Sequence, residues 1–151
     1  MECSFAEYSG APCGVNPRYT AERKVVSLSS CQKDITSHLA YYKFSGIATE
    51  VDLILSRTGT FSYEVDEIAK LMICPFHRDI FGTGWKRPTR QCTVPDSLAA
   101  HKKGRAKPDR GIGKEMSQNI RTATNCLIPV GSGELLFDRL YYYNSYIFTN
   151  Y

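Results

Sequence analysis

The segment between residues 74 and 101 constrains the fold most, because it gathers two cysteines and two histidines. Cys74 and His77 stand three residues apart, Cys92 follows a loop rich in glycine and proline, and His101 comes nine residues later. Thiolate and imidazole ligands in short-range pairs, joined by a longer loop, are typical of tetrahedral structural zinc sites. The pattern therefore predicts a structural Zn²⁺ ion held by Cys74, His77, Cys92 and His101.

Other assignments of these residues stay open at this level. Cys126 or Cys31 can replace His101 as the fourth ligand. In a reading without metal, Cys74 and Cys92 are buried thiols and His77 is a hydrogen-bonded surface ring. The spacing also differs from that of a C2H2 finger, which needs two close cysteines followed by two close histidines.

The residues around Cys74 predict a short helix. Pro75 suits the first position of a helix and Gly82 suits the position just past its end, so we expect a helix over residues 75–81. Cys74 then stands at the helix entrance, where unpaired backbone N–H groups and the positive end of the dipole favour a thiolate. His77 lies in the first turn, within reach of the same ion.

The remaining pattern predicts a small, irregular, zinc-stapled α+β domain with two to four short helices and short strands. Apolar residues at helical spacing predict helices near residues 31–43 and 114–125, and residues 51–55 fit either helix or strand. Alternation over residues 61–65 predicts a half-buried strand. Residues 127–130 predict an edge strand, because the proline among them cannot donate to a ladder.

The domain organisation follows from length and punctuation. A chain of 151 residues fits one domain with a modest core. Residues 1–28 form an irregular N-terminal arm broken by glycine and proline, in which Cys3 and Cys13 have no evident partner. Residues 29–133 form the Cys/His module, and 134–151 an aromatic tail. We expect this tail to be a truncated or alternatively read end; a transcript with the same tail would sink that hypothesis.

Cysteine usage bears on the compartment. An even number of cysteines, six, invites a disulfide framework, but that interpretation belongs to short secreted chains. The N-terminal residues are acidic and not those of a signal peptide, and no run of about 18 apolar residues occurs. We therefore expect an intracellular protein, in the nucleus or cytoplasm, with no membrane partner and with cysteines used for metal ligation or burial.

A basic stretch suggests a partner. Residues 86–114 hold nine Lys and Arg residues against two acidic ones, whereas the net charge of the whole chain is only +4. Such a stretch is a solvated loop, a nuclear import signal or a salt-dependent contact to phosphates. The candidate nucleic-acid-binding residues are Lys86, Arg87, Arg90, Lys102, Lys103, Arg105 and Lys107.

Catalysis finds little support. The chain lacks the zinc-protease, nucleophile-elbow, phosphate-loop and deaminase motifs. Four protein ligands also leave no open position on the metal for water. We therefore expect no enzyme, no catalytic residue and no small-molecule substrate.

Several of these motifs resemble a recurrent module in uncharacterised animal proteins. The resemblance rests on the residues Ile73-Cys-Pro-Phe-His-Arg-Asp, Gly82-Thr-Gly-Trp-Lys-Arg, Cys92-Thr-Val-Pro, His101, Arg110-Gly-Ile and Leu127-Ile-Pro-Val-Gly-Ser-Gly. It covers roughly residues 30–133. In the relatives the final Gly-Ser-Gly continues into further cysteines, whereas this chain continues with Glu134-Leu-Leu-Phe. The family has no known activity, so the resemblance implies a module and no specific reaction.

Together these features predict a zinc-binding interaction module that binds nucleic acid through the basic loop. The alternatives are an adaptor that binds an acidic protein, a zinc- or cysteine-dependent enzyme, and a non-functional truncated product. Metal analysis and the salt dependence of nucleic-acid binding distinguish them.

Overall fold

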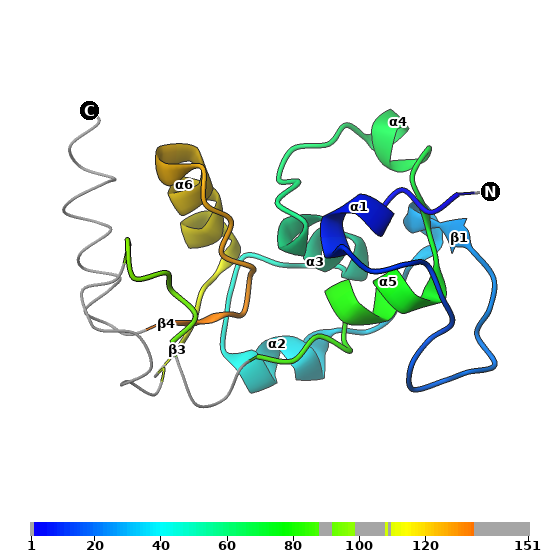
Figure 1. Cartoon of the computed structure of the whole chain (residues 1–151), viewed down its shortest axis with the longest axis horizontal. Coiled ribbons are helices and arrows are strands. Elements are labelled where there is room, and N and C mark those ends of the chain that lie inside the picture. Colours follow the sequence, from blue (N-terminus) through cyan, green and yellow to red (C-terminus); the bar gives the residue numbers. More distant parts are fainter. Residues whose placement is uncertain (1, 88–91, 99–107, 109, 135–151) are drawn as a thin grey trace. The chain divides into compact units, whose positions relative to one another are not determined.

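The computed structural model describes residues 2–87, 92–98, 108 and 110–134 (Figure 1). Within them lie six α-helices, one 3₁₀ turn and four two-residue strands in two antiparallel pairs. The predicted α+β class is confirmed, with more helices than expected. No helix in this part of the chain is both long enough and apolar enough to cross a membrane. The helices are α1 (Ala6–Ser9), α2 (Thr36–Tyr42), α3 (Glu50–Arg57), α4 (Val65–Ile68), α5 (Pro75–Phe81) and α6 (Lys114–Thr124).

The chain divides into two compact units, each made of separate segments. The first unit comprises residues 1–35 and 48–86, and the second comprises residues 36–47 and 87–151. The expected division at residues 28/29 and 133/134 stays a prediction.

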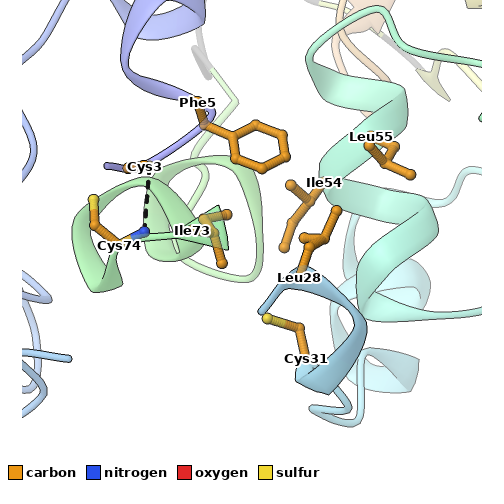
Figure 2. Close-up of a cluster of buried hydrophobic side chains, with 8 residues drawn as sticks. All are labelled: Cys3, Phe5, Leu28, Cys31, Ile54, Leu55, Ile73 and Cys74. Atoms are coloured by element: carbon orange, nitrogen blue, oxygen red, sulfur yellow. Dashed lines mark hydrogen bonds between the residues drawn. The ribbon is translucent and has the colours of Figure 1, made fainter. Parts of the chain in front are cut away.

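The first unit is built on a short antiparallel pair. In this pair β1 (Val26–Ser27) lies beside β2 (Met72–Ile73), with Val26 opposite Ile73. On the chain's way to α1, the Ser4 N–H donates to the Met72 carbonyl at 2.8 Å, which attaches the N-terminal arm to β2. Figure 2 shows the apolar cluster that results, formed by Cys3, Phe5, Leu28, Cys31, Ile54, Leu55, Ile73 and Cys74.

Three helices form close to where the sequence predicts them. Helix α5 has the predicted bounds of 75–81, with Pro75 in its first turn and Gly82 at its C-cap. Helix α6 ends at Asn125, whose φ of 57° is the left-handed conformation common at helix ends. The ambiguous residues 51–55 lie in α3, where the Thr49 hydroxyl accepts from the Asp52 N–H at 3.1 Å.

Other element predictions need correction. The helix expected over 31–43 begins only at Thr36, because the backbone at Cys31, just after the 3₁₀ turn of residues 28–30, is extended and not helical. The strand expected over 61–65 is wrong. Glu64 and Glu67 form a reciprocal capping box that begins α4, and Val65 is 81% exposed and not half-buried.

The edge strand expected over 127–130 is also wrong. The Ser132 N–H donates to the Pro129 carbonyl at 3.0 Å, so the chain turns there. The pairing strand comes later, where β4 (Gly133–Glu134) lies antiparallel to β3 (Arg110–Gly111).

The second unit is organised around α6. Met116 and Ile120 pack with Ile112, Ile128 and other apolar residues in a second buried cluster. The Ser117 hydroxyl, also buried, donates to the Ile128 carbonyl at 2.5 Å. His38 is half-buried, and its ring centroid lies 4.9 Å from that of Tyr42.

Candidate metal centre

Three cysteines and one histidine gather at the entrance of α5. The ligand atoms of Cys3, Cys13, Cys74 and His77 all lie within 4.8 Å of one another, and this group can hold a metal ion. Two members come from the N-terminal arm and two from the start of α5. All belong to the first unit.

Helix α5 fixes Cys74 and His77. Cys74 is the N-cap, and its sulfur accepts from the His77 N–H at 3.5 Å. The same turn places the Cys74 Sγ 3.1 Å from the His77 Nδ1. Pro75 favours a helix that begins at this point. This local sequence signal therefore positions two of the four residues of the group, Cys74 and His77.

The arm delivers Cys3 and Cys13. Next to the Ser4–Met72 hydrogen bond, the Cys3 Sγ accepts from the Cys74 N–H at 3.3 Å (Figure 2). The same sulfur lies 3.4 Å from the His77 Nδ1. Farther along, the Phe76 N–H donates to the Gly14 carbonyl at 3.1 Å. This contact brings the Cys13 Sγ to 3.9 Å from the same Nδ1.

The other ring nitrogen of His77 faces the arm. Its Nε2 lies 2.7 Å from the Ser9 Oγ and 3.2 Å from the Ala11 carbonyl oxygen. A proton on Nε2, donated to that carbonyl, leaves the Nδ1 lone pair directed at the three sulfurs. Metal-ligating histidines are commonly oriented through such a hydrogen bond on their second nitrogen.

Burial and hydrogen bonding set the protonation of the group. Burial acts to raise the pKa of the Cys74 thiol, but hydrogen bonds from the His77 and Gly14 backbone and the Cys3 and Cys13 side chains outweigh it, so this pKa is lowered. Burial lowers the pKa of His77 against the opposing hydrogen bond to Ala11. Burial raises the pKa of the Cys3 thiol to about 11, so metal binding must displace a proton there.

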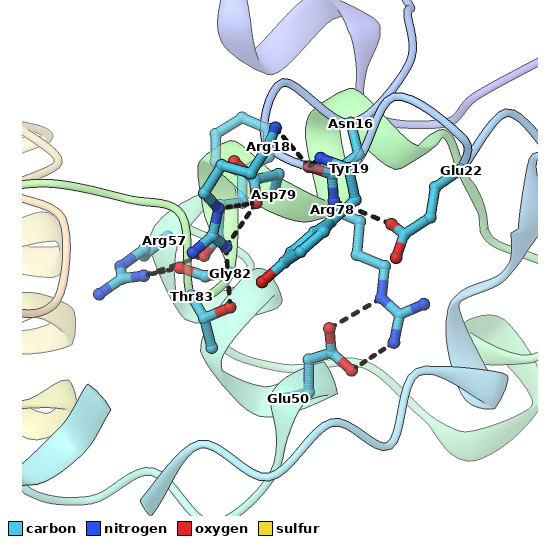
Figure 3. Close-up of polar contacts among 11 residues, drawn as sticks. Asn16, Arg18, Tyr19, Glu22, Glu50, Arg57, Arg78, Asp79, Gly82 and Thr83 are labelled. Carbon is cyan, nitrogen blue, oxygen red and sulfur yellow. Dashed lines mark hydrogen bonds and ion pairs between the residues drawn. The ribbon is translucent and has the colours of Figure 1, made fainter. Parts of the chain in front are cut away.

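Ion pairs anchor α5 beside the group (Figure 3). Arg78 binds Glu50 of α3 through two hydrogen bonds of 2.8 Å, and only 1% of the Glu50 side chain is exposed. Asp79 accepts from Arg18 of the arm at 2.6 Å. A Cβ at Gly84 would overlap the Asp79 carboxylate, so a side chain there would displace the carboxylate that Arg18 binds. These pairs hold both the arm and α3 against the helix that carries Cys74 and His77.

The structure brings together only two of the three described residues of the predicted ligand set. Cys74 and His77 come together, as the sequence predicts. Cys92 belongs to the second unit, where its Sγ donates to the Gly133 carbonyl at 3.4 Å, and it is not in the group. His101 lies outside the described residues, so the complete four-ligand set stays a prediction. Of the alternative ligands, Cys31 is buried in the first cluster and Cys126 packs against the second.

Sequence reasoning missed Cys3 and Cys13. The available signals were weak: an even cysteine count, and a Pro12-Cys13-Gly14 sequence that favours a turn. Cys3 and Cys74 are 71 residues apart in the chain, and no ligand-spacing rule joins residues at that separation.

Few of the predicted nucleic-acid-binding residues lie in the described part. Lys86 is exposed. Arg87 donates to the carbonyl oxygens of Gly131 at 2.5 Å and Tyr42 at 2.7 Å, so its guanidinium supports the second unit. The others lie outside the described residues, namely Arg90, Lys102, Lys103, Arg105 and Lys107.

Comparison of the chain with protein-family models, curated proteins and solved structures gives no match.

Proposed function

We propose that this chain is a zinc-binding interaction module whose ion is held by Cys3, Cys13, Cys74 and His77. The observation that carries the proposal is the convergence of four ligand atoms, from two distant segments, within 4.8 Å of one another. Thiolate and imidazole ligands in this proportion suit Zn²⁺, which forms structural Cys₃His sites.

The distances support a tetrahedral ion. Zinc bond lengths place a sulfur and a nitrogen ligand about 3.6 Å apart across a tetrahedral site. The three Sγ–Nδ1 distances are 3.1, 3.4 and 3.9 Å, so small shifts make room for the ion. Four protein ligands fill the coordination sphere, which supports a structural role and not a catalytic one.

The ion would connect the arm to the core of the first unit. Cys3 and Cys13 lie on the arm, whereas Cys74 and His77 lie on α5, which contacts α3. Because an unfolded chain has no preformed site, the binding free energy of structural zinc stabilises the fold directly.

Metal analysis tests the proposal. Protein purified without added zinc should contain about one zinc per chain. Substitution of Co²⁺ should give the absorption of cobalt–thiolate bonds. Cys3→Ser should lose the metal, whereas Cys31→Ser, a buried cysteine outside the group, should retain it. Equal metal content in the two variants, or none in the wild type, would overturn the assignment.

The partner we propose for the module is nucleic acid, supported by the basic composition of residues 86–114. Duplex binding that weakens steeply with salt is expected. An affinity that ignores salt, or binding only to an acidic protein, would favour the adaptor alternative.

A further inference from the structure

We propose that a peroxide releases the metal by joining Cys13 to Cys74 in a disulfide, so that the centre responds to thiol oxidation. This inference rests on the proposed function and names the regulation of the same site. Three observations carry it: the exposure of one ligand, the proximity of two sulfurs, and the separation of the cysteines outside the group.

Cys13 is the accessible member of the group. It is exposed, whereas Cys3, Cys74 and His77 are buried. Its neighbours Pro12, Gly14 and Val15 are exposed as well. A small oxidant arriving from solvent therefore meets the Cys13 sulfur first.

Cys74 is placed to complete the reaction. Its sulfur lies within 4.8 Å of the Cys13 sulfur, because all the ligand atoms of the group lie within that distance of one another. A disulfide needs its two sulfurs about 2.05 Å apart, so one of them must move. Cys13 lies on the exposed part of the arm, and a Cβ placed on Gly14 would meet Phe76 no closer than 3.6 Å, so this segment is not tightly enclosed.

The chemistry balances with one peroxide. The Cys13 thiolate attacks a peroxide oxygen, which gives a sulfenic acid and, from hydrogen peroxide, a hydroxide ion. The Cys74 thiolate then attacks the sulfenic sulfur, forms the S–S bond and expels a second hydroxide. The two sulfurs supply two electrons, and two protons convert the hydroxides to water. Only Cys3 and His77 remain as ligands, so the ion leaves.

The described cysteines outside the group are unsuited to this reaction. Cys31 is buried, with its Sγ directed at the Ser27 carbonyl 3.9 Å away. Cys92 and Cys126 belong to the second unit. Cys31, Cys92 and Cys126 therefore serve as internal controls for non-specific oxidation.

The experiment uses the zinc-loaded full chain and hydrogen peroxide. Released zinc is followed with a chromophoric chelator, and the disulfide is located by peptide mapping. One zinc is expected per Cys13–Cys74 link, and a dithiol reductant with added zinc should restore the site. Release without that link would overturn the inference.

Two variants sharpen the result. Cys13→His keeps four ligands and removes the oxidisable sulfur, so peroxide should release its zinc at least about tenfold more slowly. Cys31→Ser should match the wild type. Wild-type release rates in Cys13→His would overturn the inference, and if this variant does not take up zinc, the mapping of the wild type decides.

Failure of the proposed function can be distinguished from failure of this inference. A wild type that binds zinc but does not form the link keeps the metal site and loses the switch. A wild type without zinc overturns both the metal site and the release of metal by peroxide.

Discussion

Helices α5 and α6 bury different kinds of side chain, and each defines the chemistry of its unit. Helix α5 buries Pro75, His77 and Asp79. Helix α6 buries Met116, Ser117 and Ile120, of which only the serine is polar, and its hydroxyl is hydrogen-bonded. Apolar contacts depend little on solution conditions, whereas thiols, imidazoles and ion pairs depend on metal, oxidant and pH.

Cysteine content alone therefore does not predict where a metal site lies. Cys74 contacts an imidazole and other thiols, whereas Cys92 donates to a backbone carbonyl and packs among aliphatic side chains. The same residue type is a ligand candidate in one unit and a small apolar residue in the other. We expect the stability of the residues around α5 to depend on bound ligands. The stability of the residues around α6 should depend only on packing.

Metal removal should produce the largest contrast. At free zinc about a thousand times the Kd, binding adds about 4 kcal/mol to the free energy of unfolding. Cys74→Ala should abolish this increment and Cys92→Ala should retain it. Trp85, the only tryptophan and part of the first unit, provides a fluorescence signal for denaturation with and without chelator. Equal zinc dependence in the two variants would remove the distinction between the units.

Local sequence signals predicted part of the fold. Helix α5 was predictable because Pro75 and Gly82 are local signals at its two ends. The α+β class followed from short periodic segments. The strand over 61–65 failed because the capping box of Glu64 and Glu67 outweighed the alternation.

Two of the four residues in the Cys/His group, Cys3 and Cys13, could not be predicted from residue spacing. Cys74 and His77 belong to one helical turn, but Cys3 reaches them only because the arm pairs with β2 at Met72. Such a contact depends on tertiary packing, which no short motif encodes. Strand β2 is likewise too short to be recognised by periodicity, whereas β1 lies within residues 25–28, for which the sequence predicts a short extended piece.

Loss of the Glu50 charge should have the next largest effect. Glu50→Gln leaves the Arg78 guanidinium beside α5 without its buried counter-charge. Removal of one partner of a buried pair costs roughly 3 kcal/mol, toward the lower end here because the Arg78 side chain is 28% exposed. The free energy of unfolding of metal-free protein, followed through Trp85, measures it. Glu115→Gln, exposed on α6, is the matched control, and an equal loss there would contradict the expectation.

Acid should weaken the same ion pair. Burial acts to raise the pKa of Glu50, but hydrogen bonds from Arg78 and Lys33 outweigh it, so this pKa lies below its usual 4.5. The unfolded chain therefore binds a proton first as the pH falls. The stabilisation is complete above pH 4.5 and is lost as the pH falls through the folded pKa, by at most about 1.4 kcal/mol per pH unit for one proton. The stability difference between wild type and Glu50→Gln should narrow in this range; a constant difference would sink the explanation.

A packing change near α6 should have the smallest effect and the least dependence on conditions. Ile120 is 2% exposed, and Ile120→Val removes one buried methylene at a cost of about 1 kcal/mol. Ile54→Val makes the same change in the first cluster, where Ile54 is fully buried. Ile120→Val should lower the free energy of unfolding by the same amount with zinc, with chelator and at each pH. Ile54→Val should lower the stability measured in the unfolding transition that Trp85 fluorescence reports. Added zinc should raise the stability of that transition only. If Ile120→Val and Ile54→Val weakened zinc binding equally, the dependence on metal would not be confined to the unit that contains α5.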